Sequence, residues 1–219
     1  MKLQSSVITV IGHKTFWYSL LFCIVWANSL IGTTDIKNWL IENTLTLIAL
    51  LFLIVSYKKH KFSNFSYLSI CVFLCLHVYG SKYTYADNTF GFWLQDVFHT
   101  SRNPYDRLVH FNFGFLLFFP LQELLSKWFR LSKLEAFVIP ILIILSASAI
   151  YEITEWLVAD VFFVEEGISY LGTQGDVWDS QKDMSVAFLG VVFAAIVYLI
   201  YSVKKILKIV HNDLDHNNF

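Results

Sequence analysis

Long apolar stretches alternate with short polar segments along the chain. Six stretches stand out, and each has close to the ~20 residues that a helix needs to cross a bilayer. A backbone inside a bilayer has to satisfy its own hydrogen bonds, so these stretches are predicted to be helices. No repeat and no linker rich in Pro, Gly or Ser divides the chain. We therefore expect an all-α, polytopic integral membrane protein, a single domain over residues 1–219, with about six transmembrane helices at 15–32, 39–57, 64–80, 106–126, 135–157 and 183–203.

The first stretch resembles a signal peptide in part. It follows His13 and Lys14, but it is long, contains Trp17 and Trp26, and lacks a clear A-x-A cleavage site. We interpret it as a retained span.

The composition fits a chain that faces lipid. Hydrophobic residues make up 56% of the sequence and charged residues 15%, and the mean hydropathy is +0.56. Soluble domains contain about 25% charged residues, and so few charges cannot cover a globule of this size in water. The net charge of -1 gives no electrostatic reason to bind nucleic acid, so the expected partner is the lipid bilayer. The three cysteines lie in apolar stretches, where packing is expected rather than disulfide formation.

Lysine and arginine residues divide unequally between the two sides of the predicted helices. Eleven of the 16 fall on the side of the termini and five on the other side. The positive-inside rule places the side with eleven, and therefore both termini, in the cytoplasm. Glu123, near the inner end of the fourth stretch, is expected to face the cytoplasmic interface. The eleven are Lys2, Lys14, Lys58, Lys59, Lys61, Lys127, Arg130, Lys133, Lys204, Lys205 and Lys208.

The outer connections are expected to carry the function. Two of them, about 81–105 and 158–182, are long and contain acids, glycines and aromatic residues. Long structured loops often hold functional residues. Four polar residues of the first connection could form a lid, although such residues are usually just solvated: Asp87, Asp96, His99 and Arg102.

Ionisable residues gather at the outer ends of the last three predicted helices. The fourth stretch opens with Asp106, Arg107 and His110. Asp106 and His110 are four residues apart and share one helical face. A histidine inside a span is costly unless it is paired. The alternatives are that Asp106 is a cap or a favourable dipole partner of its helix and that His110 is a satisfied packing residue.

The fifth stretch ends with Glu152 and Glu155, two carboxylates three residues apart. The negative end of the helix dipole disfavours them, so capping does not account for them. Each charge near hydrocarbon costs roughly 2–3 kcal/mol on insertion scales. A cation, a metal ion, a proton or Arg107 is expected to neutralise them. The alternative is an interfacial pair that reaches up to water.

The last outer connection contains GTQGDVWDSQKDM, in which Asp176, Asp179 and Asp183 lead into the sixth stretch. Ser180 and Asp183 fit an S-x-x-D capping box, and Asp179 could also be a cap. Capping accounts for one or two of these acids but not for all three. Asp179 and Asp183 are four residues apart and share a helical face.

Three helices thus bring carboxylates and one imidazole to a common depth. Oxygen ligands with one histidine suit a hard or borderline divalent cation, so a divalent metal ion is a candidate cofactor, with His110, Glu152 and Asp183 as its ligands. The spacing matches no known metal signature. For an enzyme, metal-assisted hydrolysis or transfer on a lipid or cell-envelope substrate is the expected chemistry. The catalytic candidates are Glu152, Glu155 and Asp183, and the ligand-binding candidates are Asp106, Arg107, His110, Asp176 and Asp179.

Two other classes of function fit the same residues. A small proton-coupled transporter would use the carboxylates as proton carriers, but the chain lacks an obvious inverted repeat or a pair of Gly/Pro-broken helices. A non-catalytic accessory protein would use the acids as helix caps and as partners of Arg102 and Arg107.

These residues carry a resemblance to a known family. The runs YDRLVHFNFG, YEITEW and GTQGDVWDSQKDM resemble those of the YjdF-type bacterial inner-membrane proteins, a domain of unknown function. The resemblance covers most of the chain. It implies a multi-span protein of the bacterial plasma (inner) membrane and supplies no established activity.

A weaker similarity is to VanZ-like membrane proteins. These have Asp-Lys-x-x-His at the start of one helix, a Glu late in the next, and an Asp before a final helix that contains Gly. Asp106 with His110, Glu152 and Asp183 take comparable places, and Arg107 stands where that pattern usually has Lys.

Overall fold

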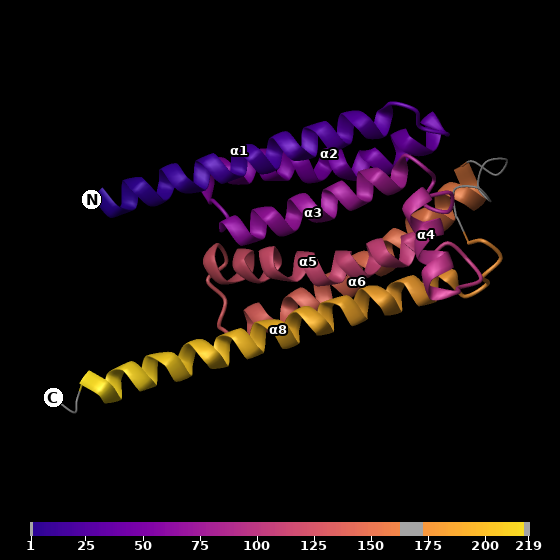
Figure 1. The fold of residues 1–219 in the computed structure, drawn as a ribbon. Helices are drawn as coiled ribbons and strands as arrows, with labels where there is room; N and C mark the ends of the chain where they lie inside the picture. The colour runs from indigo at the N-terminus through magenta and orange to yellow at the C-terminus, as the bar shows by residue number, and fades with distance from the viewer. Residues whose placement is uncertain (1, 163–172, 217–219) are drawn as a thin grey trace.

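The computed structural model describes residues 2–162 and 173–216, and every regular element in these two ranges is a helix. The expectation of an all-α protein is confirmed. Residues 163–172, in the middle of the second long outer connection, lie outside the described residues. The helices are α1 (Lys2–Leu30), α2 (Ile36–Lys59), α3 (Asn64–Ser81), α4 (Thr89–Phe98), α5 (Tyr105–Lys127), α6 (Glu135–Leu157), the short π-helix η1 (Val158–Phe162) and α8 (Asp179–His216), as drawn in Figure 1.

Five helical segments of the described chain are long and apolar enough to cross a membrane: Ile36–Lys59, Asn64–Ser81, Tyr105–Lys127, Glu135–Val161 and Asp179–Ile209. They coincide with the second to sixth predicted stretches. α1 is 29 residues long and contains most of the first stretch. The prediction of a helical membrane protein with several spans is therefore confirmed, and the first stretch as a sixth span stays a prediction.

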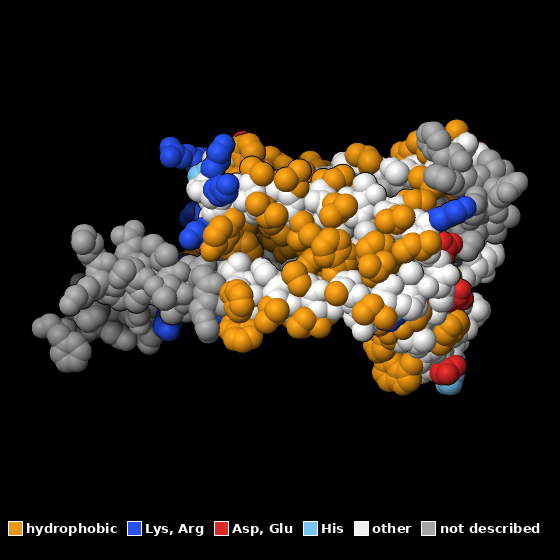
Figure 2. All heavy atoms as spheres, turned by 90° about the horizontal axis from the view of Figure 1, so that it is seen from above, with side chains coloured by type: hydrophobic (Ala, Val, Ile, Leu, Met, Phe, Trp, Pro, Cys, Tyr) orange, Lys and Arg blue, Asp and Glu red, His pale blue; other side chains and the backbone are white. Residues whose placement is uncertain are grey.

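The long helices run back and forth along one axis, so that α1 begins and α8 ends at the same end of the bundle (Figure 1). Figure 2 shows Lys and Arg side chains gathered at this end and Asp and Glu side chains at the other. Exposed basic residues here include Lys58, Lys59, Lys61, Arg130 and Lys133. The charge division predicted from the sequence is thus a physical division between the two ends.

The helices pack as two groups of three. α1, α2 and α3 form one group, α5, α6 and α8 form the other, and the contact between α3 and α5 joins them. Phe22, Cys71 and Val78 belong to the buried core of the first group, and Phe118 and Val191 to that of the second. The packing role expected for a cysteine holds for Cys71, which is buried and unbridged.

α5 and α8 meet at backbone distance. A Cβ atom on Gly114 would lie 2.0 Å from the carbonyl oxygen of Ala187, and one on Gly190 would lie 2.1 Å from that of Phe111. Neither position has room for a side chain, which is how small residues let membrane helices approach. The close approach holds the first turns of α5 and α8 against each other, and those turns carry the acids of the candidate site.

Glu123 does not face the cytoplasmic interface as predicted; it is buried. Its carboxylate accepts hydrogen bonds from the backbone N–H and the hydroxyl of Ser63, from the hydroxyl of Ser66 and from the Lys127 ammonium. Ser63 is the N-cap of α3. The carboxylate therefore fixes the start of α3 to α5, because a buried charge is stable only when its oxygens are hydrogen-bonded.

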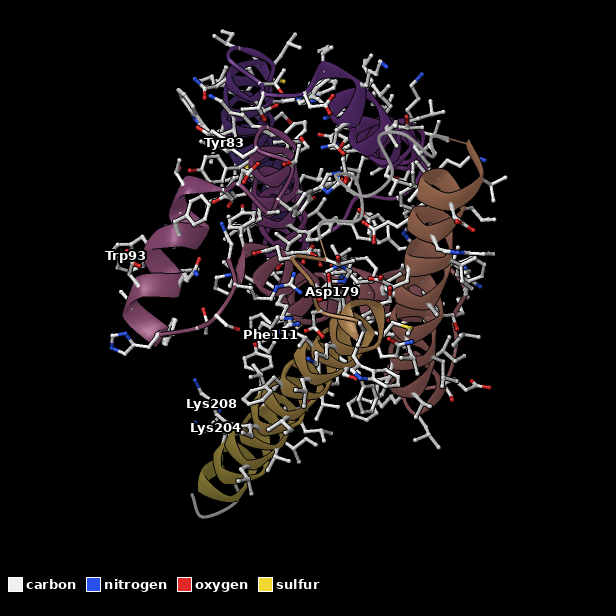
Figure 3. All side chains as sticks on the ribbon, turned by 90° about the vertical axis from the view of Figure 1, so that its right-hand side faces the viewer. Tyr83, Trp93, Phe111, Asp179, Lys204 and Lys208 are labelled. Carbon is white, nitrogen blue, oxygen red and sulfur yellow. The ribbon has the colours of Figure 1, made fainter. Side chains whose placement is uncertain are left out.

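The first long outer connection contains a helix, α4, which packs against α5. Asp87, Asp96 and His99 are exposed, whereas Arg102 is buried. Figure 3 looks along the bundle from the acidic end, with Trp93 of α4 at the periphery and Asp179 near the centre. The centre of this end, rather than α4, is where the ionisable side chains meet.

Candidate functional site

Four of the predicted residues come together at the acidic end of the bundle. Nε2 of His110 lies 3.5 Å from Oδ1 of Asp106 and 3.5 Å from Oε1 of Glu152. One carboxylate oxygen of Asp106, one of Asp183 and a ring nitrogen of His110 all lie within 4.8 Å of one another. We call Asp106, His110, Glu152 and Asp183 the carboxylate–histidine group. It draws on α5, α6 and α8, the three helices expected from the sequence.

Three of the four members of this group are shielded from solvent, and the Asp106 side chain is 20% exposed. His110, Glu152 and Asp183 are 8%, 6% and 2% exposed. Oε1 of Glu152 and Oδ1 of Asp183 are buried and accept no hydrogen bond from any described residue. Such atoms are rare in folded proteins, because a buried polar atom loses its hydration without compensation.

A second set of charges lies beside this group, on the side of the loop that precedes α8. We call Arg102, Arg107, Asp176, Asp179 and Lys182 the outer ion-pair cluster. Arg102 pairs with Asp179, and Nη2 of Arg107 lies 2.6 Å from Asp176 and 3.4 Å from Asp179. Nζ of Lys182 lies 2.7 Å from Asp176. These charges thus pair with one another, although Nε and Nη2 of Arg102 and Nε of Arg107 are buried without a hydrogen-bond partner among the described residues.

Arg107 was one of the groups considered as a counter-charge for Glu152 and Glu155. Within the described residues it pairs with Asp176 and Asp179, and more distantly with Asp183, whose Oδ1 lies 3.8 Å from Nε. Pairing with arginine, as expected for an accessory protein, is therefore seen for Asp176 and Asp179 and, at the longest distance, for Asp183.

The capping interpretation of Asp183 is wrong, and Asp106 does not cap α5 but lies in its first turn, where the helix dipole favours a carboxylate. Pro104 occupies the N-cap position of α5, with no side-chain hydrogen bond to the helix. At α8 the first helical backbone bond runs from the N–H of Lys182 to the carbonyl of Trp178, which puts Asp183 beyond the capping turn. Asp179 uses its carboxylate to bind Arg102.

The loop ahead of α8 is tied to the start of α5. Gln174 accepts a hydrogen bond from the Asn103 backbone N–H at 2.8 Å and donates one to the Asn103 carbonyl at 3.1 Å. Arg102 donates to the Thr173 carbonyl at 3.3 Å. These contacts assign a structural role to the Gln174 side chain and to the backbone carbonyl of Thr173.

Two ionisable groups outside the spans have shifted pKa values. Hydrogen bonds from Lys182, Arg107 and the Trp178 backbone hold the pKa of Asp176 well below its ordinary value. Burial raises the pKa of Tyr85 well above its ordinary value. The Asp176 carboxylate is therefore charged and the Tyr85 hydroxyl protonated at neutral pH.

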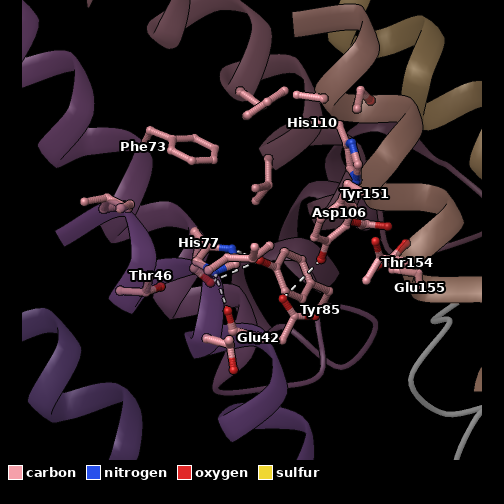
Figure 4. A pocket seen from close by; sticks show the side chains of 18 of the residues that line it. Glu42, Thr46, Phe73, His77, Tyr85, Asp106, His110, Tyr151, Thr154 and Glu155 are labelled. Atoms are coloured by element: carbon pink, nitrogen blue, oxygen red, sulfur yellow. Dashed lines mark hydrogen bonds and ion pairs between the residues drawn. The ribbon is translucent and has the colours of Figure 1, made fainter. Parts of the chain in front are cut away.

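A cavity of about 620 Å³ lies between the two helix groups, with Asp106 and His110 in its wall. Its polar end is lined by Glu42, Tyr151 and Glu155 as well as these two. Figure 4 shows these side chains, from α2, α5 and α6, turned toward one another. The remainder of the wall is largely apolar and includes Ala49, Phe73, Leu74, Phe113, Leu117 and Ala147.

The sequence reasoning missed the part of this wall that comes from the first helix group. Tyr151 donates a hydrogen bond to Glu42 at 3.1 Å. Nε2 of His77 donates to the Glu42 backbone carbonyl at 3.2 Å, and the Tyr85 hydroxyl oxygen lies 2.6 Å from Nδ1 of the same ring. Glu42 and His77 are ionisable residues inside predicted spans, the signal that could have found them.

The cavity opens on the side of α2 and α6. Thr44 and Leu45 of α2, and Ile150 and Thr154 of α6, line the cavity and are exposed. α2 packs against α3, and α6 packs against α5 and α8, so the two helices form opposite rims. In a membrane-spanning bundle an opening at this position faces lipid.

Comparisons with known proteins agree with a membrane protein. A family described as "Predicted membrane protein (DUF2238)" matches residues 14–204. The chain is 35% identical over 162 residues to "Inner membrane protein YjdF" of Escherichia coli (strain K12), which covers 73% of this chain and 77% of that protein. No solved structure matches the chain.

Proposed function

This chain belongs to the DUF2238 family of predicted membrane proteins, and from that premise we propose that it binds an amphiphilic molecule of the cell envelope from within the bilayer. The apolar chain of the ligand would occupy the cavity between the two helix groups. Its head group would meet the carboxylate–histidine group and the polar residues beside it.

One observation carries this proposal: the cavity has a polar end and an apolar end, in the order that a bilayer has. Along α5 its wall runs from Asp106 to Leu117, which at 1.5 Å per residue is about 16 Å. The polar end lies at the first turn of α5, and Phe113 and Leu117 lie toward the middle of the span. An amphiphile in the adjacent leaflet has its head and tail in the same order.

The size and chemistry of the cavity fit a small ligand. Its volume, about 620 Å³, is within the ~300–1,000 Å³ of typical ligand sites, which are mostly apolar with a few convergent polar groups. Here the polar groups are carboxylates, two histidines and Tyr151. The carboxylates can accept hydrogen bonds from a hydroxyl or amine head group, and the histidines and Tyr151 can donate hydrogen bonds to a hydroxyl or phosphate.

The proposed setting is the bacterial inner membrane, with the acidic end toward the periplasm. The relative in Escherichia coli is named an inner membrane protein. The basic residues gather at the opposite end, which the positive-inside rule assigns to the cytoplasm. A ligand of the outer leaflet would then reach the polar end directly.

The test is to identify the lipids that copurify with the protein in mild detergent. Ala147→Phe would fill the cavity from α6, and Ala49→Phe would fill it from α2. Ser146→Phe adds a side chain at the neighbouring exposed position and serves as the control. Mass spectrometry is expected to find one amphiphile enriched over bulk membrane lipid in the wild type and in the control.

The two cavity variants are expected to lose this enrichment while unfolding at a temperature close to that of the wild type. The same lipid composition in all four proteins would contradict the proposal. Comparing two filling variants on different helices guards against a local packing defect in one of them.

A further inference from the structure

We propose that Asp106, His110 and Asp183 bind one divalent cation, Zn²⁺ or Mn²⁺, with Glu152 as the fourth group in reach. Asp106 and His110 line the polar end of the cavity, so the ion would lie beside that end and this site extends the proposed function. It does not require a lipid to be bound.

The distances suit a single ion. Two ligand atoms of a tetrahedral site with bonds of about 2.1 Å are about 3.4 Å apart. The atoms of Asp106, His110 and Asp183 already lie within 4.8 Å of one another, and Glu152 lies 3.5 Å from the same His110 nitrogen. Small side-chain rotations would bring the set into coordination. The backbone contact between Gly114 and Gly190 keeps α5 and α8 from moving apart.

The charges around the site leave a deficit of positive charge. Among the described residues, the guanidiniums of Arg102 and Arg107 hydrogen-bond to Asp176, Asp179 and a loop carbonyl, and none of these bonds reaches the carboxylate–histidine group. The closest approach is Nε of Arg107, 3.8 Å from Asp183. Three carboxylates therefore face one imidazole in a buried space, where unpaired charge is costly.

The buried oxygens without hydrogen bonds point to the same conclusion independently of charge. Oε1 of Glu152, in a residue 6% exposed, lies 3.5 Å from the His110 nitrogen. Neither this oxygen nor Oδ1 of Asp183, in a residue 2% exposed, accepts a hydrogen bond from the part of the chain that the structure describes. A metal ion fills the coordination of such oxygens without the directional demand of a hydrogen-bond donor.

The ligand set selects the ion. Carboxylate oxygens with one imidazole suit Zn²⁺ and Mn²⁺, whereas soft ions require thiolates and Ca²⁺ requires six to eight oxygens. The cysteines described in the structure lie elsewhere, as Cys71 and Cys75 belong to or pack against the core of the first helix group. A divalent ion would also give the carboxylate-lined end of the cavity a positive centre for an anionic head group.

The experiment measures metal directly in the purified full-length protein. After incubation with Zn²⁺ or Mn²⁺ and removal of free ion, elemental analysis is expected to find about one ion per chain. His110→Gln and Asp183→Asn are expected to bind at least about 100-fold more weakly, beyond the ~10–100-fold typical of groups that only orient ligands. Asp87→Asn and Asp96→Asn change exposed acids at the same end and should bind as the wild type does.

Thermal unfolding in the presence of the ion provides a second measure, since a ligand that binds only the folded state raises the midpoint. The added ion should stabilise the wild type and the two surface variants but not Asp183→Asn. No stoichiometric metal in the wild type, or equal metal in Asp183→Asn, would overturn the site. Either result leaves the copurifying-lipid measurement standing, so the two proposals fail separately.

Discussion

Single residues in this protein act as ties between helices that are distant in the sequence. Arg102 and Asp179 join the start of α5 to the start of α8, and Glu123 joins α5 to the start of α3. Each tie places a charge where water is scarce, so each charge depends on the partner that it meets. Removing a partner should therefore cost more here than at an exposed ion pair.

The stability that Asp176 contributes through its ion pairs should depend on pH. Its pKa in the folded protein is held below the ordinary value by Lys182 and Arg107. A lowered pKa stabilises the folded state above the unfolded value of about 3.9, and the stabilisation is lost as the pH falls through and below that value. The unfolding midpoint of the wild type should thus exceed that of Asp176→Asn at pH 7, and the difference should begin to shrink below about pH 4 and continue to shrink as the pH falls further. A constant difference from pH 7 to pH 3 would show that the charge of Asp176 is not what matters.

Glu123→Gln should destabilise the fold by about 1–3 kcal/mol, the usual cost of leaving buried hydrogen-bonding groups without a partner. The amide cannot accept all the bonds that the carboxylate accepts from Ser63 and Ser66. Unfolding in detergent, followed by circular dichroism, measures this loss. Lys127→Met removes only the partner whose side chain is 62% exposed, and a smaller loss is expected.

At the scale of the elements, the contact between α5 and α8 determines whether the carboxylate–histidine group exists. Gly114 and Gly190 let the two backbones touch. His110 lies about one helical turn before Gly114, and Asp183 lies about two turns before Gly190, so this contact brings them together. The glycines have no chemistry of their own. They nevertheless fix the distance between residues that do.

Gly190→Ala should separate α5 from α8, because the new Cβ would lie 2.1 Å from the carbonyl oxygen of Phe111. Overpacking of this kind costs about 1–3 kcal/mol or more. A lower unfolding temperature and loss of bound metal are both expected. Ser185→Thr, which adds one methyl group at an exposed position of α8, should change neither. Normal stability of Gly190→Ala would mean that the helices can shift at no cost.

The sequence predicted the helices and their depth in the membrane but not which helices pack side by side. The spans were predictable because an apolar run of this length has one low-energy solution in a bilayer. The common depth of Asp106, His110 and Asp183 followed from their places at helix ends. Which helices become neighbours did not follow, because hydropathy reports depth and not lateral packing. Tyr85 could not be foreseen at all, since it reaches His77 from a left-handed backbone conformation (φ 53°) that costs about 1–2 kcal/mol.

At the scale of the whole molecule, the two ends differ in charge, and this asymmetry predicts an orientation. Thr100 precedes α5 and Ser132 follows it, so single cysteines introduced at these two exposed positions would lie at opposite ends of that helix. In intact cells, in a background without other cysteines, an impermeant maleimide should label the first and not the second. The reverse pattern would place the basic end outside and remove the periplasmic setting of the proposed site.

The lateral opening between α2 and α6 determines which concentration governs the binding of a ligand of the proposed kind. A molecule that enters from lipid keeps its chain in hydrocarbon throughout, so burying that chain in the cavity gains little hydrophobic free energy. Selectivity would then lie almost entirely in the head group, and the relevant concentration would be mole fraction in the leaflet. Adding empty vesicles at a fixed amount of ligand and protein would lower occupancy, whereas diluting the same vesicles with buffer would leave it unchanged.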